Sequence, residues 1–473
     1  MSATSTMLPE YVILGTLLIA MLGIMVSRAH STLPSWIGLL GTIGGLWATA
    51  DLWSRHLKPV LLFNQSLSVD NYSLFVDFLV MIAAGSTILL GWQGEREHDE
   101  FPVLVLLSAL GMMTLGMSAN LITLFLGVEI LSLPLYILAA SHRDPLGGEA
   151  GLKYFLLGAF SSGILLFGLA LIYGATGSMT FTDFAAAVSS NSPILAAGLM
   201  LALVGILFKL AIVPFHMWVP DVYEGSPDAV TSFMAFGTKV GAAVILLRFL
   251  AYGFYLSPDA WGPLLGYLAL LTMIVGNLVA LTQTNLKRLF GYSGIGHAGF
   301  LLIGVAVHTV VGARAMLFYL LPYGLAVIGA FAIITMISNG EKNVTIHDLE
   351  GLAHKKPWAA ALFIVFMLSF AGIPLTGGFI GKFYLLQAAL FAHQPGLAVG
   401  LVVGTFLGLG AYLRPLQAMF RRESNEQALA GWNVNWAQIV VLVVAVVGTI
   451  GLGVYPTPVV HMVNQSANFF WLH

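Results

Sequence analysis

The sequence contains no cysteine and very little charge. With no thiol in 473 residues, disulfide bonds, cysteine nucleophiles and thiolate-held iron–sulfur clusters are excluded for this chain. Charged residues make up 8% of the chain, whereas a soluble domain carries about 25%, so this composition cannot build a water-exposed surface. The formal net charge of −2 does not favour a nucleic-acid partner.

Apolar runs of roughly 20 residues, the length that a helix needs to cross a bilayer, recur along the whole chain. Because the runs are continuous rather than alternating, they favour helices over a β-barrel. The first run has no basic leader and no small-residue cleavage site, so we expect a spanning helix rather than a signal peptide. The pattern predicts an all-α polytopic membrane protein with about 14 transmembrane helices: 11–27, 35–53, 72–92, 102–118, 121–140, 153–174, 194–217, 229–251, 261–282, 289–308, 312–337, 358–391, 396–419 and 436–459.

Lysine and arginine fall mainly in the connections that follow odd-numbered spans. Connections after even-numbered spans hold only Arg55, Lys58 and Arg314. By the positive-inside rule, the odd connections are cytoplasmic, and both termini lie on the periplasmic side of a bacterial inner membrane. The residues in the odd connections are Arg28, Arg96, Arg143, Lys287, Arg288, Lys342, Lys355, Lys356, Arg421 and Arg422.

Two predicted spans contain helix-breaking residues. The first is "GILFKLAIVPFHMWVPDVYEG", where Pro214 and Pro220 each remove a backbone donor. The second is "AGIPLTGGFIGKFY", which holds Pro374 and the pair Gly377–Gly378. Non-helical backbone at membrane depth is tolerated only where protein or a water-filled cavity satisfies it, so both stretches are candidates for an ion path.

The broken spans are the seventh and the twelfth, which makes them five spans apart and opposite in direction. That geometry is expected of an inverted five-helix repeat. We therefore predict two inverted repeats, each with one broken helix, and a division of the chain into four parts. These are the N-terminal helices 1–3 in residues 1–101, the first repeat (spans 4–8) in 102–251, the second repeat (spans 9–13) in 252–420, and span 14 in 421–473.

We single out five ionisable residues inside predicted spans: Glu129, Lys153, Lys209, Lys239 and Lys382. A charge near a helix centre costs roughly 2.5–3.5 kcal/mol, so the five together cost on the order of 10 kcal/mol. Intramembrane charges are functional by default. Two alternatives remain open: Lys153 could extend to the interface from a helix end, and Glu129 could form a structural ion pair.

Two histidines and two arginines stand in or near the spans. His216 is a candidate for the same path, although it could instead satisfy the broken backbone, and His297 could instead be a packed polar residue. Arg248 and Arg414 lie near helix ends, where we expect them to anchor the membrane interface.

These residue types suit proton transfer. Burial makes a lysine release its proton more readily, and a nearby carboxylate holds that proton in place. A buried lysine with a movable glutamate partner can therefore load and release a proton. A series of such groups, linked by histidines, hydroxyls and water, can carry protons across a membrane.

Residues 294–299, "GIGHAG", match the dinucleotide fingerprint G-x-G-x-x-G. The fingerprint requires a preceding strand in a βαβ unit, and this stretch lies inside a spanning helix. We expect its small residues to permit close helix packing instead.

Four long stretches resemble the antiporter-like subunits of respiratory complex I, a similarity that runs over essentially the whole chain. Lys382 stands where one sibling subunit carries glutamate, and the chain shows no long lateral helix of the kind that another sibling has. Together with "PDVYEGSP", these features favour the sibling nearest the quinone-side end of the membrane arm. The stretches are "GVEILSLPLY", "FKLAIVPFHMWVPDVYEGSPDAVTSFMAFGTKVG", "GNLVALTQTNLKRLFGYSGIGHAGF" and "LSFAGIPLTGGFIGKFYLL".

The resemblance implies roles for the buried residues. Glu129 and Lys209 correspond to an interacting pair, Lys239 to a central connecting lysine, and Lys382 to the lysine of a second half-channel. Lys153 matches a further lysine implicated in the family, and His216 and His297 match polar-axis positions with weaker support. A proton would move from the cytoplasm through these groups to the outside.

The resemblance also implies the surroundings. The chain would belong to an NADH-quinone oxidoreductase and carry no cofactor itself, with FMN, iron–sulfur clusters and quinone on other subunits. Its partners would be the antiporter-like subunit M, small subunits such as K and J, and the lipid bilayer. Two alternatives stay open: a subunit of a multi-subunit Na⁺/H⁺ antiporter, and a structural spacer in the membrane arm.

Overall fold

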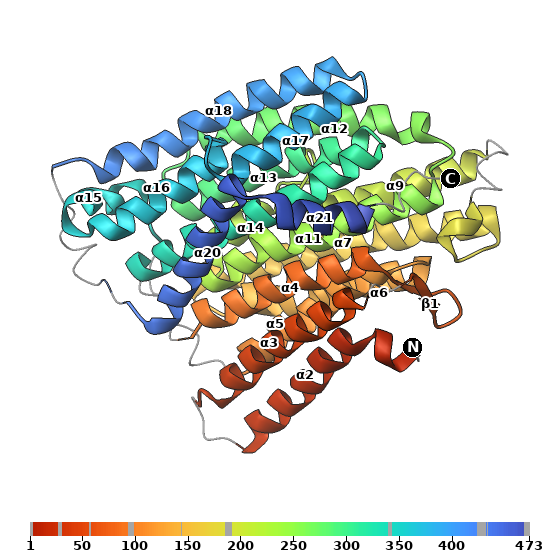
Figure 1. The fold of residues 1–473 in the computed structure, drawn as a ribbon, viewed down its shortest axis with the longest axis horizontal. Helices are drawn as coiled ribbons and strands as arrows, with labels where there is room; N and C mark the ends of the chain where they lie inside the picture. The colour runs from red at the N-terminus through yellow and green to blue at the C-terminus, as the bar shows by residue number, and fades with distance from the viewer. Residues whose placement is uncertain are drawn as a thin grey trace.

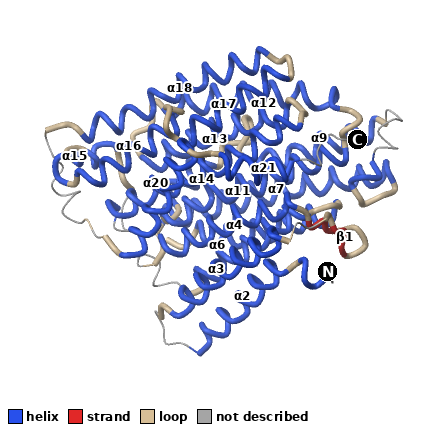
Figure 2. The backbone as a smooth tube through the Cα atoms, in the orientation of Figure 1, coloured by secondary structure: helices blue, strands red, loops and turns tan. Residues whose placement is uncertain are grey.

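The computed structural model describes residues 3–26, 31–55, 58–92, 99–142, 144–184, 192–338, 343–422, 432 and 434–467. Within these residues the chain is a bundle of long helices packed side by side (Figure 1). Among the described residues, the only β-strands are the two of a short hairpin at one end of the bundle (Figure 2).

The chain begins with a group of helices that covers one side of the bundle. The hairpin pairs its two strands antiparallel, with Val60 opposite Val69. In chain order the elements are α1 (Ala3–Thr6), α2 (Leu8–Val26), α3 (Leu33–Ser54), β1 (Val60–Leu62), β2 (Leu67–Val69) and α4 (Asn71–Leu90).

Two series of helices follow. The first comprises α5 (Phe101–Met117), α6 (Leu121–Ala139), α7 (Pro145–Thr176), the 3₁₀ turn η1 (Phe181–Asp183), α9 (Pro193–Leu210), α10 (Val219–Gly225) and α11 (Asp228–Gly253). The second comprises α12 (Pro258–Ala280), α13 (Leu286–Ala306), α14 (Val310–Ser338), η2 (Ile346–Leu349), α15 (Leu352–Lys355), α16 (Pro357–Ala371), α17 (Gly377–Phe391) and α18 (Pro395–Met419). The described chain ends with α20 (Trp436–Val454) and α21 (Thr457–Ala467).

The all-α membrane architecture predicted from the sequence is confirmed. Each predicted span overlaps a helix, and 11 of the described helices are long and apolar enough to cross a membrane. The shorter apolar helices are α5, α16 and α17, and the last two divide the predicted span 358–391. The count of 14 spans stays a prediction.

Helices α11, α13 and α14 form the centre of the bundle. Every residue of α11 except Tyr252 is buried, and α13 and α14 are nearly as covered. A helix that is apolar all round is expected to be surrounded on all sides. Peripheral helices instead expose large apolar side chains where lipid would lie, among them Leu22, Tyr267 and Phe406.

Glycines of the stretch "GIGHAG" on α13, together with Gly276 on α12, allow these two helices to pack closely, as expected. A Cβ atom on Gly276 would lie 2.5 Å from the backbone nitrogen of Gly296, and one on Gly299 would lie 2.8 Å from that of Met273. Neither position can hold a larger residue without moving a backbone.

Two pairs of backbone contacts recur at a fixed distance along the chain. Asn120 forms an isolated antiparallel bridge with Thr180, and Asn285 forms one with Thr345, each residue 165 positions further on. Both asparagines cap the helix that follows, accepting a hydrogen bond from the backbone nitrogen of the residue three positions on. The helices so aligned are α6 with α13 and α7 with α14.

The two bridges lie at opposite ends of the bundle. Ala119, beside the first, donates a hydrogen bond to the carbonyl of Ser66 in the hairpin, and the second directly precedes η2 and α15. Figure 1 shows β1 and α15 at opposite ends. This arrangement supports the predicted inverted repeat.

Candidate functional site

The first broken helix ends at Leu210 with a left-handed residue. Ala211 has φ +64°, the backbone nitrogen of Ile212 donates to the carbonyl of Leu207, and that of Ala211 donates to the carbonyl of Phe208. These two bonds make a Schellman cap, which satisfies carbonyls that the helix end would otherwise leave free.

The second broken helix ends in the same way at Ala371. Gly372 has φ +76°, the nitrogen of Ile373 donates to the carbonyl of Leu368, and that of Gly372 donates to the carbonyl of Ser369. The two breaks therefore share one backbone geometry, formed on alanine in the first and on glycine in the second.

Three of the residues predicted to break helices instead begin them. Pro220 occupies the second position of α10, where a missing backbone donor costs nothing, and Gly377–Gly378 are the first residues of α17. A Cβ atom on Gly378 would lie 2.0 Å from the carbonyl oxygen of Ser369, so this glycine lets α17 start against the end of α16. The breaks themselves hold Pro214 and Pro374.

Lys209 lies on α9, two residues before the first break, and only 3% of it is exposed. Its Nζ donates a 3.0 Å hydrogen bond to Tyr136 Oη and lies 5.1 Å from the centre of that ring. Tyr154 lies beneath the same ammonium at 5.6 Å. The ammonium is therefore enclosed by aromatic faces, which attract cations.

Glu129 lies on α6 and is half-buried, with its Oε1 atom buried and without a hydrogen-bond partner among the described residues. It is close enough to act electrostatically on Lys209, but the two side chains form no direct ion pair in the described structure. Tyr136 is the side chain that Lys209 does contact, and it feels the charge of Glu129 as well. The predicted pair is thus near but separated.

Lys239 lies in the middle of α11 and is 1% exposed. The backbone of α13 comes close to its ammonium: a Cβ atom on Gly294 would lie 3.2 Å from Nζ. The ring of Tyr323, on α14, is 5.9 Å from the same atom. Lys239 therefore stands where α11, α13 and α14 meet.

His297 lies one turn further along α13 and is fully buried. Its Nδ1 is 2.5 Å from Tyr319 Oη, its Nε2 is 2.9 Å from Tyr412 Oη, and Tyr412 also contacts Ser293 Oγ. The histidine feels the charges of both Lys239 and Lys382. It therefore lies near both lysines within a network of hydroxyl groups. Its role in a proton path stays a prediction, because a packed polar residue would need such partners too.

Lys382 lies on α17 and is 6% exposed. Its Nζ donates a 2.7 Å hydrogen bond to the carbonyl of Phe370 and lies 4.6 Å from the ring centre of Phe300. If α16 continued, that carbonyl would accept from residue 374, which is proline and has no N–H. The lysine therefore takes the place of the donor that Pro374 lacks.

Lys153 and His216 lie outside this buried set. The Lys153 side chain is 41% exposed and forms ion pairs with Glu149 and Asp221, each at 2.6 Å. Burial alone would raise the pKa of Asp221, but hydrogen bonds from Lys153 and Arg288 hold that pKa below its ordinary value. His216 is half-buried in the first break. The roles of both residues stay predictions.

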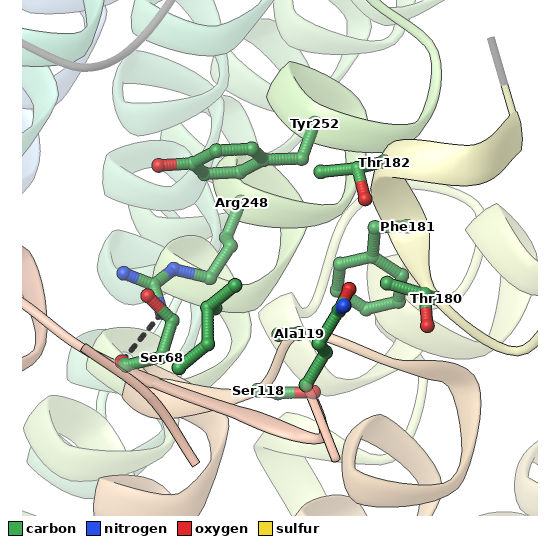
Figure 3. A pocket seen from close by; sticks show the side chains of 10 residues that line it. Ser68, Ser118, Ala119, Thr180, Phe181, Thr182, Arg248 and Tyr252 are labelled. Carbon is green, nitrogen blue, oxygen red and sulfur yellow. Dashed lines mark hydrogen bonds between the residues drawn. The ribbon is translucent and has the colours of Figure 1, made fainter. Parts of the chain in front are cut away.

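The structure corrects the expectation for Arg248, which is 1% exposed and ion-paired with Asp70 rather than placed at the interface. It also donates to the carbonyl of Ser68 (Figure 3). A cavity of about 50 Å³ lies beside it, lined by Ser118, Thr180 and Tyr252 among others (Figure 3). The other arginine, Arg414, binds the carbonyls of Leu281 and Gln283 at a helix end and is half-buried, in keeping with an anchor.

Five further buried charges among the described residues were missed: Lys287, Asp228, Glu10, Asp77 and Asp70, the partner of Arg248. Lys287 is 3% exposed, pairs with Asp228 at 3.5 Å and donates to the carbonyl of Ser226, although the sequence placed it in a cytoplasmic connection. Glu10 and Asp77 are buried in α2 and α4. Asp77 stands inside a predicted span, so the rule that singled out the five charges would have found it; Glu10 lies one residue outside its span.

Known proteins are similar to this chain over nearly its whole length. The family described as "NADH:quinone oxidoreductase/Mrp antiporter, TM" matches residues 118–408. The NADH-quinone oxidoreductase subunit N of Trichlorobacter lovleyi is 39% identical over 472 residues, covering 96% of both chains. That of Chromohalobacter salexigens is 39% identical and covers 98% of this chain and 99% of its own.

Solved structures agree with these relatives. A chain of respiratory complex I from Thermus thermophilus with bound aureothin is 35% identical, with a TM-score of 0.82, and covers 96% of this chain and 98% of its own. A chain of the Mrp complex from Dietzia sp. has a TM-score of 0.89 at 22% identity, covering 100% of this chain and 98% of its own. The second likeness shows the fold alone.

Proposed function

The chain belongs to the NADH:quinone oxidoreductase/Mrp antiporter membrane family, and we propose that it is subunit N of a proton-pumping NADH-quinone oxidoreductase. The relatives at 36–40% identity that carry this name support the assignment. Within such a complex, the chain's partners are the other membrane-arm subunits, including antiporter-like M and small subunits such as K and J, together with the lipid bilayer.

The observation that carries the transport role is the set of buried lysines. Lys209, Lys239 and Lys382 are each at most 6% exposed, and they come from three different helices, α9, α11 and α17. An ammonium in such surroundings is energetically costly, and a role in the passage of charge explains why three of them are present. Each can accept a proton when neutral and pass it on when charged.

The proposed direction of passage follows the predicted route with one refinement. Lys209, its charge adjusted by Glu129, loads from the first break, and Lys239 passes the proton across the middle of the bundle. His297 and the hydroxyls of Tyr319 and Tyr412 then bridge Lys239 to Lys382 at the second break. Lys153 and His216 serve, in this proposal, where the path meets water.

The end of the bundle with α15 faces the cytoplasm in this proposal, and both chain termini face the periplasm of a bacterial inner membrane. The supporting charges among the described residues are Lys287, Arg288, Lys355, Lys356, Arg421 and Arg422. Four residues used for the orientation lie outside the described residues: Arg28, Arg96, Arg143 and Lys342.

We assign no redox chemistry to this chain. FMN, iron–sulfur clusters and quinone would be held by other subunits, whose reaction would drive the proton movement through altered charge or conformation in this chain. Among the described residues, no group of three or more His, Asp or Glu side chains is arranged to hold a metal ion.

Replacement of Lys239 tests the transport role. The purified complex, reconstituted in liposomes, would be assayed for NADH oxidation and for proton uptake with a pH-sensitive dye. We expect Lys239→Ala to lower the protons moved per NADH, because the central group is lost, while Lys355→Ala, at an exposed position, leaves the ratio unchanged.

An unchanged ratio in the Lys239→Ala complex would favour the structural spacer instead. An Na⁺/H⁺ antiporter is the other alternative, and the Mrp likeness at 22% identity shares only the fold. Proton movement that required sodium but not NADH would support it.

A further inference from the structure

Two carboxyl side chains meet between the N-terminal helices, away from the lysines. Glu10, in the first turn of α2, is 6% exposed, and Asp77, in the second turn of α4, is fully buried. The two carboxyl groups lie within hydrogen-bonding reach of each other. No part of the proposed proton route uses them.

Three of the four carboxyl oxygens of the pair have no hydrogen-bond donor among the described residues. Both carboxyl oxygens of Asp77 and Oε2 of Glu10 are buried and without a partner among the described residues. An ionised carboxylate only accepts hydrogen bonds, so two ionised groups here would repel each other and leave their oxygens unsatisfied. Burying even one unpaired carboxylate is costly.

The nearest charges do not solve this problem. Asp70, two turns before Asp77 on α4, adds negative charge on the same face. Arg248, on α11, is already committed to Asp70 and to the carbonyl of Ser68. No cation among the described residues pairs with Glu10 or Asp77.

We propose that Glu10 and Asp77 form a proton-binding site. One proton resides on an oxygen of one carboxyl group, and this O–H donates a hydrogen bond to the carboxylate of the other. The ligand is the proton itself, taken from water and returned to it, so no other reactant is needed. The site is separate from the lysine route.

Binding of this proton fastens α2 to α4. The outer face of α2 is exposed at Leu18, Ile19 and Leu22, and its inner face packs mainly on α3 and α5. A polar contact from Glu10 to Asp77 therefore adds a link to α4 that this packing does not provide. Loss of the proton places two like charges across that contact. The site thus couples the attachment of α2 to protonation.

Infrared difference spectroscopy of the purified native complex tests the proposal. A protonated carboxyl group gives a carbonyl stretch that shifts in D₂O, and this band is expected in the wild type. Both Asp77→Asn and Glu10→Gln should lose it, because the introduced amide supplies the donor and the remaining carboxyl group ionises. Asp183→Asn, at an exposed carboxylate, should keep it.

The band should persist in Lys239→Ala, so failure of the lysine route leaves this result intact. Identical spectra of the wild type and both amide variants would overturn the proposal. Loss of the wild-type band on adding sodium at constant pH would overturn it too, since the pair would then bind a metal cation. If Asp77→Asn does not assemble, Glu10→Gln makes the same test.

Discussion

The two broken helices end in the same backbone turn but use their lysines differently. Lys209 precedes its break and donates to a side chain, the hydroxyl of Tyr136. Lys382 follows its break and donates to the backbone, at the carbonyl of Phe370. A side-chain partner can move and respond to a neighbour such as Glu129, whereas a backbone partner is fixed. The first lysine is therefore suited to adjustment, and the second to holding the break together.

The largest effect is expected from Lys382→Ala. It removes a transport group and leaves the Phe370 carbonyl without a donor, which costs about 1–3 kcal/mol of unfolding free energy. We expect proton pumping to be at least about 10-fold slower, which corresponds to about 1.4 kcal/mol or more of activation free energy. The thermal denaturation midpoint of the solubilised complex should also be lower.

Lys382→Arg separates the two roles, since arginine can still donate to the carbonyl but does not release its proton. It should recover the denaturation midpoint without recovering pumping. A Lys382→Ala complex as stable as the wild type would show that the lysine does not support the break.

Lys209→Ala should rank next, with pumping lowered to a similar extent but unfolding free energy changed by less than about 1 kcal/mol. The variant loses the hydrogen bond to the hydroxyl of Tyr136. It also removes a buried ammonium, whose desolvation is costly, and this offsets part of the loss. The same dye assay and denaturation scan compare the two lysines directly.

Tyr136→Phe provides the matched control, because it removes the hydrogen bond and keeps the ammonium. Equal destabilisation by Lys209→Ala and Lys382→Ala would contradict the distinction between the two lysines.

The shared turn gives a pair of opposite substitutions. Ala211→Gly should stabilise the first break by about 1 kcal/mol, because alanine at φ +64° is strained and glycine is not. Gly372→Ala should destabilise the second by about 1 kcal/mol or more, since its Cβ would also lie 3.0 Å from Cδ of Lys382. Denaturation midpoints that shift in the same direction for both would refute the common geometry.

The smallest effect concerns acid. The pKa of Asp221, beside the first break, lies below its ordinary value, since bonds from Lys153 and Arg288 outweigh the opposing effect of burial. Its stabilising contribution is therefore present above the unfolded pKa of about 4 and is lost as pH falls through the lower folded pKa. Because these side chains are partly exposed, we expect less than about 1 kcal/mol. Asp221→Asn should flatten the acid side of the stability profile, measured by denaturation from pH 6 to about pH 3; an unchanged profile would exclude the contribution.

Much of the molecule could be predicted from the sequence because lipid imposes simple rules. Apolar length located the helices, and the rarity of charge inside them pointed to Lys209, Lys239 and Lys382. Burial could not be read in this way near helix ends, so Arg248 was taken for an interface anchor. Its partner, Asp70, is 178 residues away, and such contacts arise only from packing.

The same reason explains the details of the site that stayed hidden. The hydroxyl groups around His297 come from α14 and α18, which no local pattern brings together. The donation from Lys382 to Phe370 depends on the angle at which α17 leaves the break. Glu10 and Asp77 appear as a pair only once α2 and α4 have taken their places in the bundle.

The two bridges set a limit on how this chain can vary. Asn120 and Thr180 are 60 residues apart, and so are Asn285 and Thr345, so equal lengths of chain span the bundle and return in each series. One residue added to a helix between such fixed points would turn every following side chain by about 100° and move it about 1.5 Å along the axis. Side chains that contact neighbouring helices would be turned away from their partners. The chain can therefore accept many replacements in these stretches but very few changes of length.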